Sequence, residues 1–183
     1  MRALLRFDRV ALRRGGRLLF EGLDLELVPG DAVKISGPNG SGKSSLIRLA
    51  AGLLQAERGS VERSQLSLAD DSIALDRELA VRRAIRFWEG DVDGAMDAVG
   101  LTALGDVPVR LLSSGQLKRA TLARVAASGA PLWLLDEPLN GLDADGAGRL
   151  ARLIDRHRSA GGAVLAASHL PLPGDWRTLE LGA

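Results

Sequence analysis

The sequence predicts an α/β fold in which helices cover both faces of a mostly parallel sheet. Short apolar runs such as "LWLLDEP" and "AVLAAS" alternate with helical patterns, and a glycine-rich loop joins one such run to a helix. Alternating leucines near the amino end indicate a small antiparallel β subdomain. We expect a single domain over residues 1–183, with a short helical lobe at roughly 70–127.

Composition narrows the class of protein. The chain has 183 residues, 46% of them apolar, which is enough for one core, and its formal net charge of +1 does not favour a nucleic-acid binder. It has no cysteine and two histidines, so disulfides and cysteine zinc sites are excluded. No apolar run reaches the roughly 18 residues that cross a bilayer. We expect a soluble chain whose membrane role would depend on a partner.

The first third of the chain is expected to start with two strands joined by a turn at Gly15–Gly16, because "LDLEL" alternates apolar and polar residues. A second turn at Pro29–Asp31 leads into the strand "AVKIS". The helix "SSLIRLAAGLL" follows the glycine-rich loop. Its apolar face is expected to carry three leucines: Leu46, Leu49 and Leu53.

The middle of the chain is less regular. "GSVERSQLSLADD" fits one or two short strands, and "ELAVRRAIRFWEG" places Val81, Ile85 and Trp88 at helical spacing before Gly90. A second short helix is expected at "DGAMDAVGL", ending at Gly100, and a longer one at "SGQLKRATLARVAAS". Together these helices form the expected lobe.

The last third is expected to contain two buried parallel strands, "LWLLDEP" and "AVLAAS", separated by a helix. That helix, "DGAGRLARLIDRHRSAGG", carries Leu150, Leu153 and Ile154 near one stripe. His157 lies in the same helix without a motif, and we interpret it as a packing or surface residue. "TLEL" is expected to be an edge strand.

The glycine-rich loop matches the pattern G-x-x-x-x-G-K-[ST] of a phosphate-binding loop. Glycines let backbone N–H groups converge on phosphate oxygens, and the helix that follows adds its positive end. Lys43 can reach the β and γ phosphates, and the Ser44 hydroxyl can ligate Mg²⁺. A chance glycine-rich turn is the alternative, which the strand–loop–helix context disfavours. The expected phosphate-binding residues are Gly37, Pro38, Asn39, Gly40, Ser41, Gly42, Lys43, Ser44 and Ser45.

An acidic pair ends the buried strand "LWLLDEP". This position would place Asp136 beside the Mg²⁺ of the loop, and Glu137 where it could orient and polarise an attacking water. Taken alone, two carboxylates at a strand end would be interpreted as solvent-exposed groups without a catalytic role. The phosphate-binding loop in the same chain favours the catalytic interpretation.

The segment "LLSSGQLKRATLAR" contains Leu112–Gln116, which closely resembles the LSGGQ signature of ABC-type ATPases. The order of loop, signature, "LLDEP", "NGLD" and "SH" is also that of this family, and the resemblance spans nearly the whole chain. Protein kinases and small GTPases have no such segment. The resemblance implies a P-loop NTPase fold of the ABC-ATPase type, with ATP and Mg²⁺ as cofactors.

In ABC-type ATPases, two subunits close head to tail around two ATP molecules, so the resemblance implies a homodimer. The signature of one chain would contact the ATP held by its partner through Ser113, Ser114, Gly115 and Gln116, with Ser114 in place of the family's first glycine. Asp143 in "NGLD" resembles the D-loop residue that crosses the dimer. His169 resembles the switch histidine, which would contact the γ phosphate and support Glu137 in catalysis.

Two departures from the family pattern concern nucleotide contacts. A glutamine that contacts Mg²⁺ usually begins the helical lobe, but here Ser72 or Asp71 fills that position, and Gln65 comes too early. Ser72 is therefore a weak candidate as a metal ligand. An aromatic residue usually stacks on adenine near the first hairpin, where "RRGGRLLF" offers Arg13 or Arg14 instead.

A narrower resemblance is to the ATP-binding subunits of cytochrome c maturation haem exporters, carried by "RGGRLLFEGL", "GPNGSGKSSLIRLAAGL", "PLWLLDEPLNGLD" and a histidine followed by "LPL". It implies an ATP hydrolase that powers haem release or export through integral membrane partners. The chain would lie peripherally on the cytoplasmic face of the inner membrane, with no direct haem binding and no nucleic acid.

Alternatives remain for the function. They are the ATPase of another ABC importer or exporter, a soluble ABC ATPase acting on nucleic acid or ribosomes, and a cassette that binds ATP without hydrolysing it. The helical lobe should carry the docking surface for membrane partners. Phe87 and Trp88 are candidates for it, although we favour core packing for both.

Overall fold

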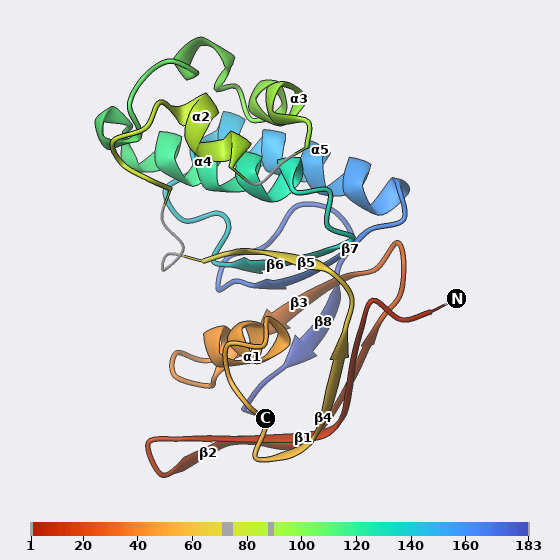
Figure 1. The fold of residues 1–183 in the computed structure, drawn as a ribbon. Helices are drawn as coiled ribbons and strands as arrows, with labels where there is room; N and C mark the ends of the chain where they lie inside the picture. The colour runs from red at the N-terminus through yellow and green to blue at the C-terminus, as the bar shows by residue number, and fades with distance from the viewer. Residues whose placement is uncertain (1, 71–74, 88–89, 183) are drawn as a thin grey trace.

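The computed structural model describes residues 2–70, 75–87 and 90–182, and arranges them in layers (Figure 1). Within these residues, the central layer is a sheet of five parallel strands in the order β5-β6-β7-β3-β8. The strands are β3 (Ala32–Ser36), β5 (Leu66–Ala69), β6 (Leu132–Asp136), β7 (Ala163–Ala167) and β8 (Arg177–Glu180). The predicted parallel sheet is confirmed, and β8 lies at its edge as expected.

The small antiparallel sheet contains β1 (Leu5–Arg14), β2 (Arg17–Leu27) and β4 (Arg58–Arg63), in the order β2-β1-β4. Gly15 and Gly16, with φ of 54° and 78°, form the predicted turn between β1 and β2. The third strand was not foreseen in this sheet. β4 pairs with β1 across more than 40 residues of chain, and its polar sequence does not identify its partner.

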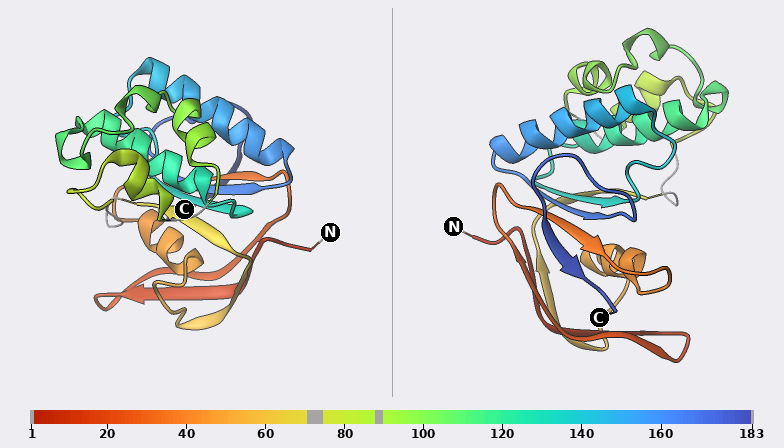
Figure 2. Two further views of the ribbon diagram at one scale, coloured as in Figure 1. Left: turned by 45° about the horizontal axis from the view of Figure 1, so that its top comes forward. Right: turned by 180° about the vertical axis from the view of Figure 1, so that it is seen from behind.

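Helix α1 (Lys43–Ala50) lies between the two sheets (Figures 1 and 2). Leu46, Ile47 and Leu49 are buried there against the inner faces of both sheets. The expectation that Leu53 extends this face is wrong, because its side chain is 58% exposed. The helix ends at Ala50, and Gly52 turns the chain away with φ of 80°.

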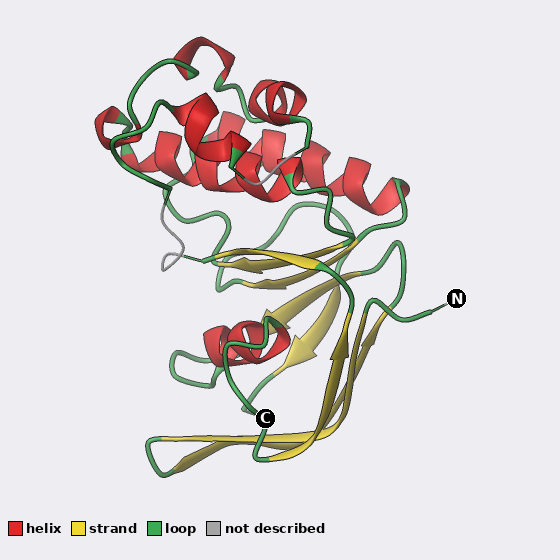
Figure 3. Ribbon diagram, in the orientation of Figure 1, coloured by secondary structure: helices red, strands yellow, loops and turns green. Residues whose placement is uncertain are grey.

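The other face of the sheet carries the remaining helices, which Figure 3 shows as one layer above the strands. They are α2 (Val81–Arg86), α3 (Val92–Ala98), α4 (Ser114–Ala127) and α5 (Ala144–Ser159). The sequence did not predict two short 3-10 turns, η1 (Thr102–Leu104) and η2 (Val109–Leu111). Helices α2 and α3 pack on α4, whereas α4 and α5 also contact strands. None of the helices in the described part of the chain combines the length and apolar character that crossing a bilayer requires.

Strand β6 packs side chains into the cores on both faces of the parallel sheet. Leu132 and Leu134 belong to the core shared with α1, whereas Trp133 and Leu135 belong to the core under the helical layer. The ring of His157 stacks on Trp133, with centroids 3.8 Å apart and planes 10° apart. This contact confirms the packing interpretation of His157.

The side chain of Phe87 does not enter the core. It is 80% exposed just after α2, so the expectation of core packing is wrong for this residue. Helix α2 buries one face but ends at Arg86, so Phe87 lies just past the part of the helix that packs on the core. The residues on the buried face are Val81, Ala84 and Ile85. Trp88 lies outside the described residues.

Candidate functional site

The glycine-rich loop runs from the end of β3 to the start of α1, and its backbone requires glycine at several positions. Gly37, Gly40 and Gly42 have φ of 144°, 78° and 103°, in a region that other residues rarely adopt. A Cβ atom on Gly37 would also collide with the carbonyl oxygen of Leu181. These backbone angles let the loop form the tight curve that phosphate binding by backbone N–H groups requires.

Lys43 is buried in this curve although it carries a charge. Its Nζ donates hydrogen bonds to the carbonyl oxygens of Gly37 at 2.7 Å and Pro38 at 3.0 Å. The side chain is thus held inside the loop, and an ammonium has a third N–H donor for an anion. The structure places Lys43 where the sequence predicts a phosphate contact.

The Ser44 hydroxyl and the Asp136 carboxylate meet at the carboxyl end of β6. Ser44 Oγ donates to Asp136 Oδ1 at 3.1 Å. Burial raises the pKa of Asp136, and the hydrogen bond from Ser44 and the charge of Arg48 oppose that shift, while Glu137 adds to it. A hydroxyl and a carboxylate are the hard oxygen ligands that suit Mg²⁺, which otherwise keeps waters and phosphate oxygens. These two residues fit such an ion.

Glu137 and His169 form a hydrogen-bonded pair next to the loop. Glu137 Oε2 accepts from the backbone N–H of His169 at 3.3 Å and lies 2.8 Å from its ring Nδ1. Glu137 has φ of 45°, an unusual value for a residue with a Cβ, and its N–H donates to the carbonyl of Ala167 at 2.8 Å. The loops after β6 and β7 are therefore tied together at this carboxylate.

A cavity of about 400 Å³ brings the loop, Glu137 and the first hairpin together. Arg14 lines it, whereas Arg13 binds Glu57 at 3.4 Å and the carbonyl of Gly16 at 3.0 Å instead. Of the two arginines that the sequence offered for the adenine contact, the structure therefore brings Arg14 to the cavity and not Arg13. The complete lining is Arg14, Leu19, Asn39, Gly40, Gly42, Lys43, Ser44, Ser45 and Glu137.

Leu19 was not foreseen at this site. Its side chain lies against Gly42, where an added Cβ atom would approach it to 3.3 Å. The signal in the sequence is its place three residues after the hairpin turn, and a strand residue there can face either side of the sheet. Because Gly42 has no side chain, it allows both the positive φ of the loop and the close contact with Leu19 of the hairpin.

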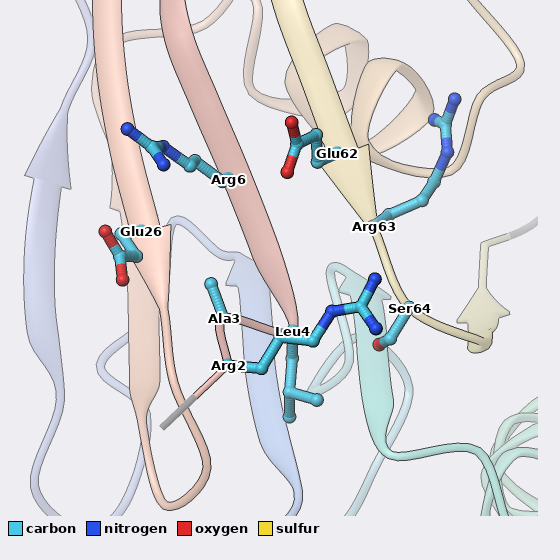
Figure 4. A pocket seen from close by; sticks show the side chains of 8 residues that line it. All are labelled: Arg2, Ala3, Leu4, Arg6, Glu26, Glu62, Arg63 and Ser64. Atoms are coloured by element: carbon cyan, nitrogen blue, oxygen red, sulfur yellow. The ribbon is translucent and has the colours of Figure 1, made fainter.

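A second cavity, of about 440 Å³, lies beside the start of the small sheet and contains none of the predicted site residues (Figure 4). Arg63 lines it and directs its guanidinium toward α1. Its Nη1 lies 3.1 Å from the carbonyl oxygens of Leu49 and Ala50, at the carboxyl end of the helix. This cation stabilises the negative end of the helix whose positive end faces the phosphate loop.

The signature residues surround the amino end of α4. Ser113 caps this helix in a reciprocal arrangement: its Oγ accepts from Gln116 N–H at 3.3 Å, and Gln116 Oε1 accepts from Ser113 N–H at 2.9 Å. Ser114 is the first residue of the helix. Gly115 must be glycine, because a Cβ atom would lie 2.7 Å from the carbonyl oxygen of Gly141.

A cavity of about 230 Å³ joins this helix end to the loop that contains Asp143. The Asp143 carboxylate accepts from Gly146 N–H at 2.7 Å and caps α5. The lining is Ser113, Gly115, Gln116, Arg119, Gly141, Leu142 and Asp143. It shares no residue with the cavity at the phosphate loop, so one chain presents the two predicted half-sites at separate places.

None of the residues considered as replacements for the family's Mg²⁺-contacting glutamine is placed at the site by the described part of the structure. Ser72 and Asp71 lie outside the described residues. Gln65 is exposed and precedes β5, at the opposite end of the strand from Asp136, which agrees with the expectation that it comes too early. The structure adds Lys118 of α4, whose Nζ lies 3.4 Å from the backbone carbonyl of Asp136.

Comparison with known proteins decides the family. A sequence model of the family described as "ABC transporter" matches residues 20–140. This chain belongs to the ABC transporter family. The match includes the phosphate loop, the signature and the acidic pair, and ends before Asp143 and His169. The chain is an ABC-type ATP-binding subunit, and the predicted ATP hydrolase is confirmed as an ABC ATPase.

Two curated relatives are both named "Cytochrome c biogenesis ATP-binding export protein CcmA". The one from Sphingopyxis alaskensis is 54% identical over 180 residues, covering 94% of this chain and 93% of that protein. The one from Novosphingobium aromaticivorans is 55% identical over 166 residues, covering 89% and 87%. A solved ATP-binding subunit of an ABC transporter superposes with a TM-score of 0.85 at 19% identity, covering 98% of this chain and 88% of its own, which confirms the predicted ABC-ATPase fold.

Proposed function

We propose that this chain binds ATP with Mg²⁺ and hydrolyses it between two head-to-tail copies, and that hydrolysis powers haem release or export by integral membrane partners in cytochrome c maturation. The observation that carries the first part is the separation of the two half-sites on one chain. ABC ATPase subunits act in pairs and with membrane subunits. The names of the relatives, which refer to cytochrome c biogenesis and to export, support the second part.

The phosphate-loop half binds the nucleotide. Backbone N–H groups within residues 39–45 and the Lys43 ammonium hold the phosphates, and Arg14 and Leu19 face the base end from the hairpin. Ser44 and Asp136 would hold Mg²⁺, which neutralises charge on the phosphate oxygens when it is bound. Arg14 offers a guanidinium plane for stacking on adenine. Ser72, a weak candidate as a metal ligand, has no part in this proposal.

Glu137 orients and activates the attacking water, and His169 holds Glu137 in place. With its proton on Nδ1, His169 donates to Glu137 Oε2, and the second carboxylate oxygen accepts from a water. A simultaneous contact from His169 Nε2 to the γ phosphate requires the second ring proton. The ring would then stabilise the negative charge of Glu137 through Nδ1 and that of the γ phosphate through Nε2.

The signature half acts on the ATP of the partner copy. Since Ser113 Oγ accepts from Gln116, its O–H can donate to a γ phosphate oxygen, and the amino end of α4 adds positive potential. Ser114, Gly115 and Gln116 form the rest of this surface, and Asp143 would line the boundary between copies. A dimer therefore contains two complete sites and a monomer none.

We place the chain peripherally on the cytoplasmic face of the inner membrane, bound to integral membrane subunits. Its role there needs neither direct haem binding nor nucleic acid. An ATPase subunit of another ABC importer or exporter is the second candidate, because the chemistry of the site does not specify the cargo.

The absence of cysteine allows a clean test of the head-to-tail dimer. Asn39 and Ser114 are exposed on the two half-sites, so the double variant Asn39→Cys with Ser114→Cys, in a Glu137→Gln background, should form a disulfide between copies when MgATP is added. Each single-cysteine variant is the control. Equal cross-linking without nucleotide, or none with it, contradicts the arrangement.

The cargo is tested by purifying the tagged full chain from solubilised membranes. We expect haem-handling integral membrane proteins to copurify, and their haem spectrum to respond to ATP in the unmodified complex but not in Lys43→Ala. Recovery of membrane subunits that handle another solute supports the second candidate, and recovery of ribosomes contradicts both.

A further inference from the structure

Asp70 is a buried carboxylate that the proposed function does not use. It follows the last residue of β5, and its side chain is only 1% exposed. The parallel register pairs Ala69 with Leu135, so the next residues, Asp70 and Asp136, come side by side at the carboxyl edge of the sheet. Asp70 also contributes to the raised pKa of Asp136 through its negative charge.

Arginines from opposite faces of the sheet reach the carboxyl end of β5, which Asp70 follows. Arg48 is on α1, the helix of the phosphate loop, and its Nε lies 3.7 Å from Asp70 Oδ2. Arg124 is on α4, the helix of the signature, where it is 2% exposed and donates from Nη2 to the carbonyl of Leu68. Burial lowers the pKa of Arg124, and the negative charge of Asp70 opposes that shift.

The position of β5 makes this arrangement possible. β5 is an edge strand of the sheet, whereas α1 and α4 lie on opposite faces (Figure 1). A carboxylate at the end of an interior strand would have neighbouring strands on both sides. Asp70 instead lies where long side chains from both layers can reach around the sheet edge. Removing one partner of a buried charge is strongly destabilising, so the charge of Asp70 constrains Arg48 of α1 and, through its field, Arg124 of α4.

We propose that Asp70 is a positioning residue, which with Arg48 and Arg124 transmits the state of the phosphate loop to the signature helix within one chain. This inference rests on the proposed function, in which the amino end of α4 contacts the ATP of the partner copy. When the nucleotide draws on Ser44 and Asp136, Arg48 responds to the changed charge beside Asp70, and Arg124 carries that change to α4. The link sets the orientation in which α4 meets the ATP of the other copy.

Hydrogen–deuterium exchange of the full chain tests the link without relying on turnover. The measurement is made at a dilution where sedimentation shows a monomer, so that partner contacts do not protect α4. In the unmodified chain, MgATP should slow exchange in residues 43–50 and also in residues 118–127. In Asp70→Asn, we expect the first response to remain and the second to be lost.

Two further variants show whether a lost response comes from the broken link or from misfolding. Arg48→Gln removes the link from a partly exposed side, so it should abolish the same response if Asp70→Asn fails to fold. Asp93→Asn is the matched control, because Asp93 is an exposed carboxylate paired with Arg82 in the helical lobe. It should keep both responses. Since α4 would be misplaced, Asp70→Asn should lower kcat about 10- to 100-fold with little change in KM for ATP.

The outcomes separate this inference from the proposed function. If residues 118–127 still respond to MgATP in Asp70→Asn and Arg48→Gln as strongly as in the unmodified chain, the proposal is overturned while nucleotide binding stands. If residues 43–50 do not respond in the unmodified chain, nucleotide binding at the loop fails, and both are overturned. A fall in kcat with a matching rise in KM also overturns the positioning role.

Discussion

The two halves of the ATP site are built by different means. In the phosphate-loop half, side chains are held by the core: Lys43 is 8% exposed and bonded within its loop, and Ser44 meets Asp136 from another strand. In the signature half, Ser113 and Ser114 are exposed, and the order comes from local caps on α4 and α5. Under the proposed function, the first half can bind nucleotide within one chain, whereas the second presents a surface for the ATP of a partner copy.

This difference separates the expected effects of substitution. Changes in the phosphate-loop half should affect nucleotide binding in a single chain, at any protein concentration. Changes in the signature half should leave binding intact and affect turnover. Turnover by the isolated chain should therefore be weak and rise more than linearly with protein concentration, because each site needs two copies.

The largest effect is expected from Lys43→Ala. The phosphates would lose a buried cation, and two carbonyl oxygens would be left facing them, so kcat/KM for ATP should fall at least about 10³-fold. Equilibrium binding of a fluorescent ATP analogue and phosphate release measure the loss. Lys34→Ala, in the strand before the loop, is the control and should retain ATP binding. Normal turnover by Lys43→Ala would mean that the cradle assignment is wrong.

Glu137→Gln should separate binding from chemistry within the same half. The amide keeps the size of the side chain but cannot accept a proton, so hydrolysis should fall about 10²- to 10⁴-fold while ATP affinity stays close to that of the unmodified chain. An ATP-bound dimer should accumulate and be visible by size-exclusion chromatography. If the variant hydrolyses ATP at the usual rate, Glu137 has no part in the mechanism.

Gly115→Ala tests the signature half. Its new Cβ atom would meet the carbonyl oxygen of Gly141, which displaces the end of α4 relative to the Asp143 loop. ATP binding to the monomer should be unchanged, but kcat of the dimer should fall about 10- to 100-fold. Gly148→Ala in α5 has room for its methyl group and serves as the control. A loss of ATP binding in Gly115→Ala would contradict the separation of the halves.

How far the sequence predicts these halves depends on how local their determinants are. The phosphate loop and the cap of α4 are set by residues within a few positions of one another, so their patterns can be recognised directly in the sequence. The structure accordingly brings Lys43 to the loop and Ser44 to Asp136 as expected. The roles proposed for these residues remain to be tested by the substitutions above.

The features that the sequence did not reveal depend on distant parts of the chain. Strand β4 joins the small sheet, Leu19 reaches Gly42, and Arg63 caps α1 across 13 and 14 residues of chain. None of these contacts has a local pattern that names its partner. Phe87 shows a related limit, because helical spacing identifies a buried face only when the end of the helix is known.

A smaller effect is expected at the hairpin, where a matched pair of arginines is available. Arg14 lines the nucleotide cavity, whereas the adjacent Arg13 pairs with Glu57. An exposed cation–π contact is worth about 0.5–1 kcal/mol, so Arg14→Ala should raise KM for ATP about two- to fivefold with kcat unchanged. Arg13→Ala should not change KM. Equal effects of the two substitutions would remove Arg14 from base recognition.

The smallest effect concerns the packing under the helical layer, which supports the signature half. Burial lowers the pKa of His157, so the folded chain binds this proton less readily than the unfolded chain, whose imidazole titrates near pH 6.5. The stability that neutral His157 contributes is therefore complete above about pH 6.5 and is lost as the pH falls toward the folded pKa. Urea unfolding across this range should show a decline that His157→Phe removes, because phenylalanine keeps the stack on Trp133 without titrating. A decline of the same size in His157→Phe would assign it to other groups.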